Sequence, residues 1–288
     1  MTAREIRRVG VVGGGLMGGG FAELCALRGF DVHVVASGPA SAARDHARLL
    51  RSLEKSVTKQ KITAEQAAAA EAKVSFGADL GELADRDLVL EAVREDETVK
   101  TAVFQTLDKV VRAETAVLAS TTSAIPLIRL AKVTERPGRV IGVHFFNPVP
   151  VLPLVEIVPS LLTDDSTVED SVEFVTTGLA KEVVRSPDRA GFVVNALLVP
   201  YLLSAIRMVE SGFASAEDVD RGMTLGCAHP MGPLRLMDMI GLDVVAAVGD
   251  ALYAEYHEPL YAPPPLLTRM VDGGLLGRKT GRGFYDYS

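Results

Sequence analysis

A glycine-rich loop between an apolar strand and an apolar helix limits most strongly how this chain can fold. A valine-rich run at 9–12 leads into GGGLMG at 13–18, which has the spacing G-x-G-x-x-G. In such a loop Gly13 allows the tight turn, Gly15 lets the backbone approach a pyrophosphate, and Gly18 lets the helix pack close to the strand. The pattern predicts a dinucleotide on the helix N-terminus. The residues expected to contact it are Gly13, Gly15, Leu16, Met17 and Gly18.

The end of the next predicted strand bears on which dinucleotide binds. An Asp or Glu about 20 residues after the glycine motif usually binds the adenosine ribose of NAD, but Ala36 and Ser37 occupy that place here. Without the carboxylate the site no longer repels a 2′-phosphate, and Arg44 or Arg48 would be its distant partners. We therefore expect NAD next to Ala36 and leave NADP open as the alternative.

Short apolar runs alternate with longer helical stretches over much of the chain, which predicts a parallel sheet covered by helices. The stretch between the second run and Val74 is rich in Ala, Lys, Arg and Glu and long enough for two helices. We expect a helical hairpin here, with Thr63 and Gln66 as the capping box of its second helix. The expected strands are 9–12, 32–35, 88–90, 116–119, 140–143, 155–158 and 183–185.

Strand patterning stops after 186–188, and helical patterning continues to about Leu276. The expected fold is therefore α/β: a Rossmann-type, doubly wound sheet domain at 1–187, followed by an all-helical substrate and dimerisation domain at 188–288. Apolar helices need a partner surface, and a second subunit could provide it, so we expect a homodimer through the C-terminal domain. The helices expected there are 192–209, 216–225 and 242–256.

Composition argues against several classes of partner. The net charge of the 288 residues is −7 and both signs are interspersed, so we expect no nucleic acid. The longest apolar run, 193–203, is interrupted by Asn195 and Pro200 and is shorter than the ~20 residues that span a bilayer. The polar start at 1–8 has no signal pattern, which predicts a cytoplasmic protein.

Cysteine and histidine usage gives no sign of a metal. Cys25 and Cys227 have no ligand spacing, and we interpret both as reduced core thiols. The five histidines are dispersed, with no ligand spacing to one another or to cysteine. We therefore expect no metal site.

Polar residues follow or interrupt three expected strands near the edge where a dinucleotide would bind. Ser123 follows one strand, His144 follows the next, and Glu156 lies within the third. Oxidation of an alcohol needs a base near neutral pKa, which favours His144, and a carboxylate such as Glu156 would fix its tautomer. Taken singly, such a histidine is often a satisfied core residue, and a glutamate between two apolar neighbours often points to solvent.

Seven segments spread over the chain carry a resemblance to a known family. They are GGGLMGGGFA at 13–22, VLEAVRED at 89–96, ASTTS at 119–123, VIGVHFFNPVPVLPLVEIV at 140–158, GFVVN at 191–195, HPMGPLRLMDMIGLD at 229–243 and GRKTGRGFYDYS at 277–288. From Val9 to Tyr287 the chain resembles the 3-hydroxyacyl-CoA dehydrogenases, particularly the short bacterial 3-hydroxybutyryl-CoA dehydrogenases.

The resemblance implies reversible oxidation of a short (3S)-3-hydroxyacyl-CoA to the 3-oxoacyl-CoA. It implies His144 as the general base, Glu156 as its partner, and Ser123 with Asn195 as the residues that hold the substrate oxygen. It further implies that certain charged residues lie near the ligands. These are Lys55 and Lys59 at the CoA phosphates, and Glu91, Glu95 and Lys100 near the cofactor.

Departures from the family pattern leave the substrate less certain than the reaction. The usual S-N-T-S-S reads STTSA at 120–124, and Ala196 and Ala228 replace an Arg and an Asn or Tyr. A hydroxyacyl group on an acyl carrier protein, as in the synthesis of polyketide extender units, is therefore an alternative substrate. A catalytically silent structural homologue is a third reading, against which the four retained site residues argue.

Overall fold

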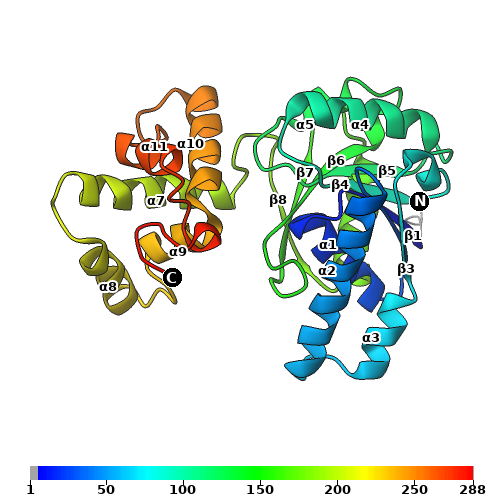
Figure 1. Cartoon of the computed structure of the whole chain (residues 1–288). Helices are drawn as coiled ribbons and strands as arrows, with labels where there is room; N and C mark the ends of the chain where they lie inside the picture. Colours follow the sequence, from blue (N-terminus) through cyan, green and yellow to red (C-terminus); the bar gives the residue numbers. More distant parts are fainter. Residues whose placement is uncertain (1–5, 288) are drawn as a thin grey trace. The chain divides into compact units, whose positions relative to one another are not determined.

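The computed structural model describes residues 6–287. Most of the polar start at 1–8 and the last residue of the C-terminal motif, Ser288, lie outside the described residues. The chain divides into two compact units, Met1–Asp188 and Arg189–Ser288, each with its own hydrophobic core (Figure 1). This division lies one residue from the boundary expected from the sequence.

The first unit contains an eight-stranded sheet in the order β3-β2-β1-β4-β5-β6-β7-β8. The chain moves outward from β1 in one direction through β2 and β3, and in the other through β4, β5 and β6. The loop after β1 therefore lies where the strand order reverses, which is where such sheets bind ligands. The strands are β1 Arg8–Val12, β2 Asp31–Val35, β3 Val74–Gly77, β4 Leu88–Glu91, β5 Val117–Ser120, β6 Val140–Phe145, β7 Leu154–Pro159 and β8 Glu182–Arg185.

The expected Rossmann-type sheet is confirmed, but the sheet is mixed and not purely parallel. β7 runs antiparallel to β6, and β8 runs parallel to β7. The physical reason is the short connection at 146–153, since a parallel crossover needs a dozen or more residues. The expectation of a parallel sheet was wrong for these two strands, and β3 was not among the expected strands.

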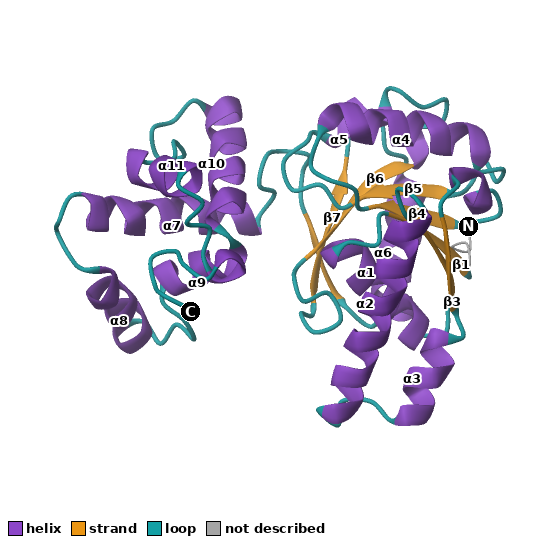
Figure 2. Cartoon of the chain, in the orientation of Figure 1, coloured by secondary structure: helices purple, strands orange, loops and turns teal. Residues whose placement is uncertain are grey.

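Helices cover both faces of the sheet, as the doubly wound fold requires (Figure 2). On one face α1 and α6 pack over a core in which the Phe21 ring lies 5.2 Å from Phe145 and 6.3 Å from Phe174. On the other face lie α4 and α5. The elements are α1 Leu16–Leu27, α4 Glu97–Val110, α5 Leu127–Ala131, α6 Asp165–Glu173, the π-helix η3 Phe174–Gly178, and the short 3₁₀ turns η1 Leu80–Leu83 and η2 Pro137–Arg139.

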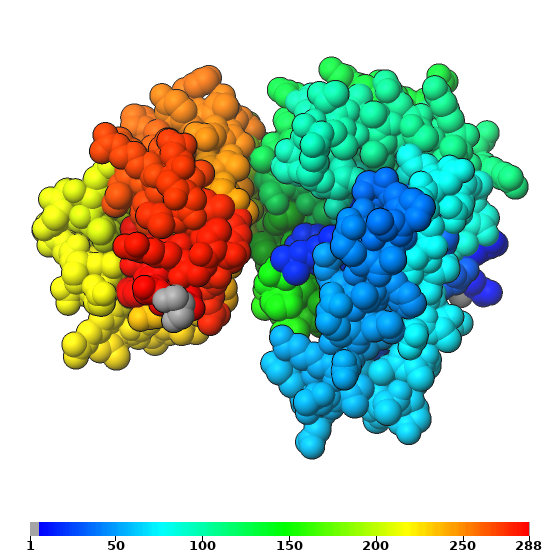
Figure 3. Space-filling view, viewed as in Figure 1, coloured from blue at the N-terminus to red at the C-terminus, as the bar shows by residue number. Residues whose placement is uncertain are grey.

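The expected helical hairpin is formed by α2 (Pro39–Thr58) and α3 (Ala64–Glu71) and projects from the rest of the first unit, as Figure 3 shows in blue to cyan. The predicted capping box is present. The Gln66 amide donates to Thr63 Oγ1 at 3.2 Å, and the Thr63 amide donates to Gln66 Oε1 at 2.9 Å. This reciprocal pair fixes where the second helix begins.

The second unit is helical, as expected, and its C-terminal segment is anchored by two buried carboxylates. Asp220 accepts hydrogen bonds from the Leu234 amide at 2.7 Å and the Tyr285 hydroxyl at 2.8 Å, and Asp238 accepts from the Phe284 amide at 2.9 Å. Two short helices that begin with proline, α9 and α11, were not predicted. The helices are α7 Val194–Glu210, α8 Ala216–Gly226, α9 Pro233–Ile240, α10 Leu242–Tyr256, α11 Pro265–Asp272 and η4 Arg278–Thr280.

The two cysteines differ in their surroundings. Cys25 on α1 is buried and free, as expected, and burial raises the pKa of its thiol well above the usual value. Cys227 is exposed directly after α8, so its interpretation as a core thiol was wrong. It stands at the end of an amphipathic helix, where burial depends on the face that a residue occupies and not only on whether the residue is small and apolar. None of the helices within 6–287 is long and apolar enough to cross a bilayer.

Candidate active site

Two neighbouring strands bring His144 and Glu156 together. The antiparallel register of β6 and β7 places these residues directly opposite each other, so their side chains emerge on the same face. His144 Nδ1 lies 2.8 Å from Glu156 Oε2. Glu156 is fully buried and does not point to solvent. Because a carboxylate only accepts hydrogen bonds, Nδ1 is the donor in this contact, and in the neutral imidazole Nε2 keeps its lone pair.

The other nitrogen of the His144 ring faces Ser123. Ser123 follows β5, and its Oγ lies 3.1 Å from His144 Nε2. The Phe146 ring packs edge-on against the imidazole with 4.8 Å between ring centroids, which restricts ring rotation. The three predicted residues of this unit therefore form one chain of contacts, from carboxylate through imidazole to hydroxyl.

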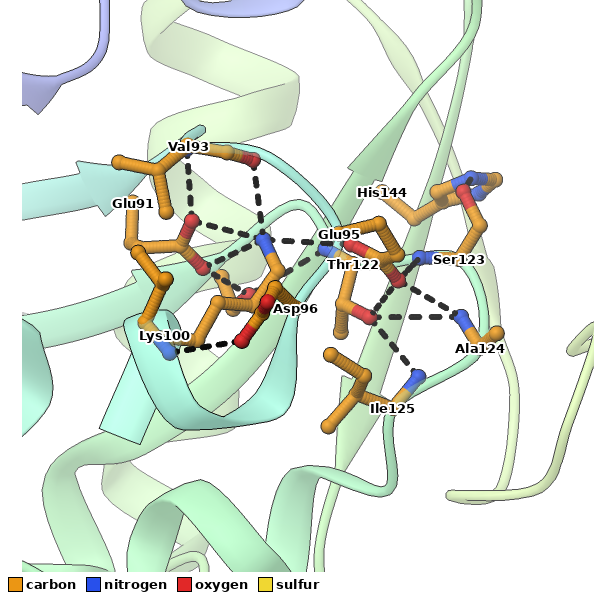
Figure 4. A network of polar contacts seen from close by, with 12 residues as sticks. Glu91, Val93, Glu95, Asp96, Lys100, Thr122, Ser123, Ala124, Ile125 and His144 are labelled. Atoms are coloured by element: carbon orange, nitrogen blue, oxygen red, sulfur yellow. Dashed lines mark hydrogen bonds and ion pairs between the residues drawn. The ribbon is translucent and has the colours of Figure 1, made fainter. Parts of the chain in front are cut away.

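The loop that carries Ser123 is held by Glu95 (Figure 4). Glu95 Oε1 accepts from the backbone amides of Ser123 at 3.0 Å and Ala124 at 3.2 Å, and also from the Thr122 hydroxyl. The Thr122 oxygen in turn accepts from the Ile125 amide at 2.9 Å. A single carboxylate thus fixes the turn that presents the serine hydroxyl to His144.

Behind this loop lies a fully buried ion pair between Glu91 at the end of β4 and Lys100 on α4 (Figure 4). Lys100 Nζ lies 2.7 and 2.9 Å from the two Glu91 carboxylate oxygens and 3.2 Å from Glu95. Glu91 also accepts from the Ser120 hydroxyl at 2.6 Å. The pair therefore links α4, β4 and β5 to the loop of Ser123.

A cavity of about 770 Å³ opens at the end of β1, where the glycine loop predicts a dinucleotide. The loop fits a pyrophosphate, because a Cβ built on Gly15 would meet no atom within 4 Å and leaves the approach open. Gly13 has a φ of +93°, and a Cβ on Gly18 would lie 2.0 Å from the Gly13 carbonyl oxygen. These are the roles expected for the three glycines.

Only part of the predicted cofactor set lines this cavity. Gly13, Gly15 and Ala36 are on its wall. Six predicted residues are not: Leu16, Met17, Gly18, Glu91, Glu95 and Lys100. Glu91 and Lys100 instead hydrogen-bond to the backbone of Val93, which does line it.

The cavity wall also includes polar residues of α2 and of the turn just before it. Ser41 and Asp45 were missed by the sequence analysis, whereas Ser37, Arg44 and Arg48 were noted there. The signal that would have found Ser41 and Asp45 is helical spacing, because residues three and four apart share one face.

A second cavity, of about 600 Å³, lies between the hairpin and the loop 146–153. Lys55 and Lys59 line it, as does the buried Glu23. The cavity contains two further cations that the sequence analysis did not single out, Arg28 and Lys61. The excess of positive charge suits a ligand with several phosphates.

Asn195, the fourth predicted site residue, belongs to the second unit. It lies half-buried in the first turn of α7. Its approach to Ser123 stays a prediction. Within residues 6–287 no group of three or more His, Cys, Asp or Glu side chains is arranged to hold a metal ion.

Comparison with known proteins accounts for both units. Residues 8–189 match the family model of the 3-hydroxyacyl-CoA dehydrogenase NAD-binding domain, and residues 191–287 match that of the C-terminal domain. A 3-hydroxybutyryl-CoA dehydrogenase of Mycobacterium tuberculosis is 54% identical, with 98% of this chain and 99% of the relative covered. One from Bradyrhizobium diazoefficiens is 43% identical, with 99% and 97% covered.

Solved structures agree. The crystal structure of (S)-3-hydroxybutyryl-CoA dehydrogenase PaaH1 from Ralstonia eutropha has a TM-score of 0.93 at 43% identity, with 99% of this chain and all of that chain covered. Two family models that together span nearly the whole chain, and full-length relatives well above 30% identity, leave no ambiguity about descent. The chain belongs to the 3-hydroxyacyl-CoA dehydrogenase family, a family of oxidoreductases.

Proposed function

We propose that this protein interconverts a short (3S)-3-hydroxyacyl-CoA, such as 3-hydroxybutyryl-CoA, and the corresponding 3-oxoacyl-CoA. The single observation that carries the proposal is the buried contact of His144 with Glu156 on one side and Ser123 on the other. A structural homologue without activity would have no need to keep a histidine base with its second nitrogen directed at a hydroxyl. The relatives named as 3-hydroxybutyryl-CoA dehydrogenases support the choice of substrate.

In this proposal His144 Nε2 removes the proton of the substrate 3-hydroxyl. Glu156 keeps the imidazole in the productive tautomer and stabilises the imidazolium that forms. The Ser123 hydroxyl and the Asn195 amide hold the substrate oxygen. When bound, the nicotinamide supplies the acceptor for the hydride that leaves C3, the carbon that carries the hydroxyl.

The dinucleotide would be held by the cavity at the end of β1. Gly13 and Gly15 leave room for the pyrophosphate, and the adenosine would extend toward Ala36. The glycine loop would be supported from the start of α1 by Leu16, Met17 and Gly18. The cofactor would not contact Glu91, Glu95 or Lys100 directly, because these residues act through the loops that they hold in place. Both NAD and NADP fit this description, and the residues near Ala36 decide between them.

The CoA phosphates would lie in the cavity beside the hairpin, where Lys55 and Lys59 are joined by Arg28 and Lys61. A charged cavity of this kind matches the compact phosphates of CoA better than a flat docking face for a carrier protein. A carrier-protein substrate is therefore the alternative that must be distinguished from CoA by experiment.

We also propose a homodimer that forms through the second unit. Several large apolar side chains of this unit are exposed, including Leu197 at 73%, Phe213 at 78% and Leu225 at 74%. Exposed apolar side chains of this size often belong to interfaces. Light scattering coupled to size exclusion should give twice the chain mass, and a monomer would refute the proposal.

We also propose a cytoplasmic location. Two free cysteines support it, because thiols stay reduced in that compartment.

The substrate is tested by following the oxidation of reduced nicotinamide with three acceptors: acetoacetyl-CoA, acetoacetyl-pantetheine and an acetoacetyl carrier protein. We expect the highest kcat/KM with acetoacetyl-CoA and a product of S configuration. A higher kcat/KM with the carrier protein would replace CoA by the carrier as substrate. Turnover with none of the three would refute the proposed reaction.

A further inference from the structure

We propose that Ser37, Ser41 and Arg44 form a subsite for the 2′-phosphate of NADP(H), and that this protein uses NADP(H) in preference to NAD(H). The inference deepens the proposed function and depends on it for the presence of a nicotinamide dinucleotide. It names the one part of the cofactor that the family resemblance leaves undecided.

The first argument is the residue at the end of β2. Ala36 is buried to 6% exposure and lines the cofactor cavity, and its amide donates to the Gly77 carbonyl at 3.0 Å. This is the position from which a carboxylate would bind the adenosine ribose and repel a phosphate on it. A methyl group removes both effects and leaves space beside the ribose.

The second argument is the cluster of donors next to that space. Ser37 Oγ and Ser41 Oγ lie 3.1 Å apart, and Arg44 Nη2 donates to Ser41 Oγ at 2.7 Å. All three residues line the same cavity as Ala36. Two hydroxyls and a guanidinium at hydrogen-bonding distance from one another form the donor set that a phosphate dianion requires.

The third argument is the charge that remains available. Three arginines and one acid line the cavity, namely Arg44, Arg48, Arg94 and Asp45. Asp45 is paired with Arg48 at 3.0 Å, and Arg48 also donates to the Gly14 carbonyl at 2.7 Å. Arg48 is therefore already engaged by Asp45 and by the glycine loop at 13–18. Arg44 forms no ion pair with any residue in the described range 6–287, so its charge can be neutralised by a ligand.

The test measures binding without turnover. Isothermal titration calorimetry compares 2′,5′-ADP with 5′-AMP, which lacks only the 2′-phosphate, and with 5′-ADP, which matches its number of phosphates. We expect 2′,5′-ADP to bind at least roughly tenfold more tightly than both, because charge-assisted hydrogen bonds to a phosphate are strong. Equal affinities of 2′,5′-ADP and 5′-ADP would overturn the proposal.

Three variants locate the effect. Arg44→Ala should remove most of the preference for 2′,5′-ADP, whereas Arg51→Ala, an exposed arginine on the same helix outside the cavity, should keep it. Ala36→Asp should reverse the ratio of kcat/KM for NADPH and NADH toward NADH. An unchanged preference in both Arg44→Ala and Ala36→Asp would also overturn the proposal.

These outcomes separate the subsite from the reaction. Tight 2′,5′-ADP binding without turnover of any acetoacetyl thioester would refute the proposed function and leave the subsite intact. Turnover of acetoacetyl-CoA that favours NADH, with no preference for 2′,5′-ADP, would refute the subsite and leave the reaction intact.

Discussion

The proposed catalytic site, around His144 and Glu156, and the proposed adenosine subsite, around Ser37 and Arg44, are built in opposite ways. At the catalytic end, Glu156 and the ion pair of Glu91 with Lys100 are fully buried, and each polar group contacts another across neighbouring elements. At the adenosine end, Ser37 and Arg44 are exposed and contact only near neighbours in sequence.

This difference bears on how such an enzyme can change. A substitution in the buried network leaves a charge or a donor unsatisfied, which costs stability as well as activity. A substitution on the exposed start of α2 removes no internal contact of that kind. We therefore expect the reaction to be resistant to change and the choice of cofactor to be adaptable, and the following predictions test this contrast in order of expected effect.

The largest effect is expected from Glu156→Gln. The amide keeps the shape of the side chain but no longer fixes the tautomer or stabilises the imidazolium, so kcat for acetoacetyl-CoA should fall about a thousandfold. Glu182→Gln, on the adjacent strand and exposed, is the matched control and should retain kcat. A kcat within twofold of wild type in Glu156→Gln would show that the carboxylate has no part in the reaction.

Lys100→Met should mainly affect stability. Removing one partner of a buried pair leaves Glu91 as an uncompensated charge, at a cost of about 3–5 kcal/mol in the free energy of unfolding. Urea denaturation of Lys100→Met is compared with Lys109→Met, which changes an exposed lysine of the same helix. If both variants unfold at the same urea concentration, the buried pair does not stabilise the first unit.

The double variant Lys55→Ala, Lys59→Ala should have a moderate effect confined to CoA. Two exposed phosphate contacts contribute roughly 1–2 kcal/mol together, so KM for acetoacetyl-CoA should rise about fivefold to thirtyfold with little change in kcat. KM for acetoacetyl-pantetheine, which lacks the adenosine phosphates, should stay the same. Lys73→Ala, outside the cavity, serves as control. An equal rise for both substrates would contradict phosphate binding.

The smallest effect is expected from Glu23→Gln. Burial raises the pKa of Glu23, and a hydrogen bond from Ser52 opposes this only in part. Because the pKa is raised in the folded state, the contribution of Glu23 to the free energy of unfolding is fully present below the ordinary pKa of the carboxyl group. It is lost as the pH rises through the raised value, since the buried carboxyl group must then ionise. The variant should therefore melt slightly above wild type at pH 8 and at the same temperature at pH 4. A lower melting temperature at pH 8 would contradict this assignment.

Much of the candidate site could be predicted because it depends on local patterns. The glycine loop at 13–18 and the capping box of Thr63 are short motifs with a direct physical meaning, and both have the predicted geometry. His144 and Glu156 were named from strand ends and residue chemistry.

What could not be predicted depends on contacts between distant segments. The direction of β7 reverses in the structure, and this reversal is what places Glu156 opposite His144. Periodicity gives the faces of a strand but not its neighbour or its direction. The family resemblance implied that Lys100 lies near the cofactor, whereas its burial depends on how α4 packs against the ends of β4 and β5.

The most direct test of the central claim is a single-turnover stopped-flow experiment with acetoacetyl-CoA, reduced nicotinamide and the His144→Ala variant. His46→Ala, a histidine of α2 that lines neither cavity, is the matched control. We predict that His144→Ala slows hydride transfer by at least about a thousandfold while calorimetry shows unchanged 2′,5′-ADP binding, and that His46→Ala behaves as wild type. Hydride transfer at the wild-type rate in His144→Ala would contradict the assignment of His144 as the catalytic base.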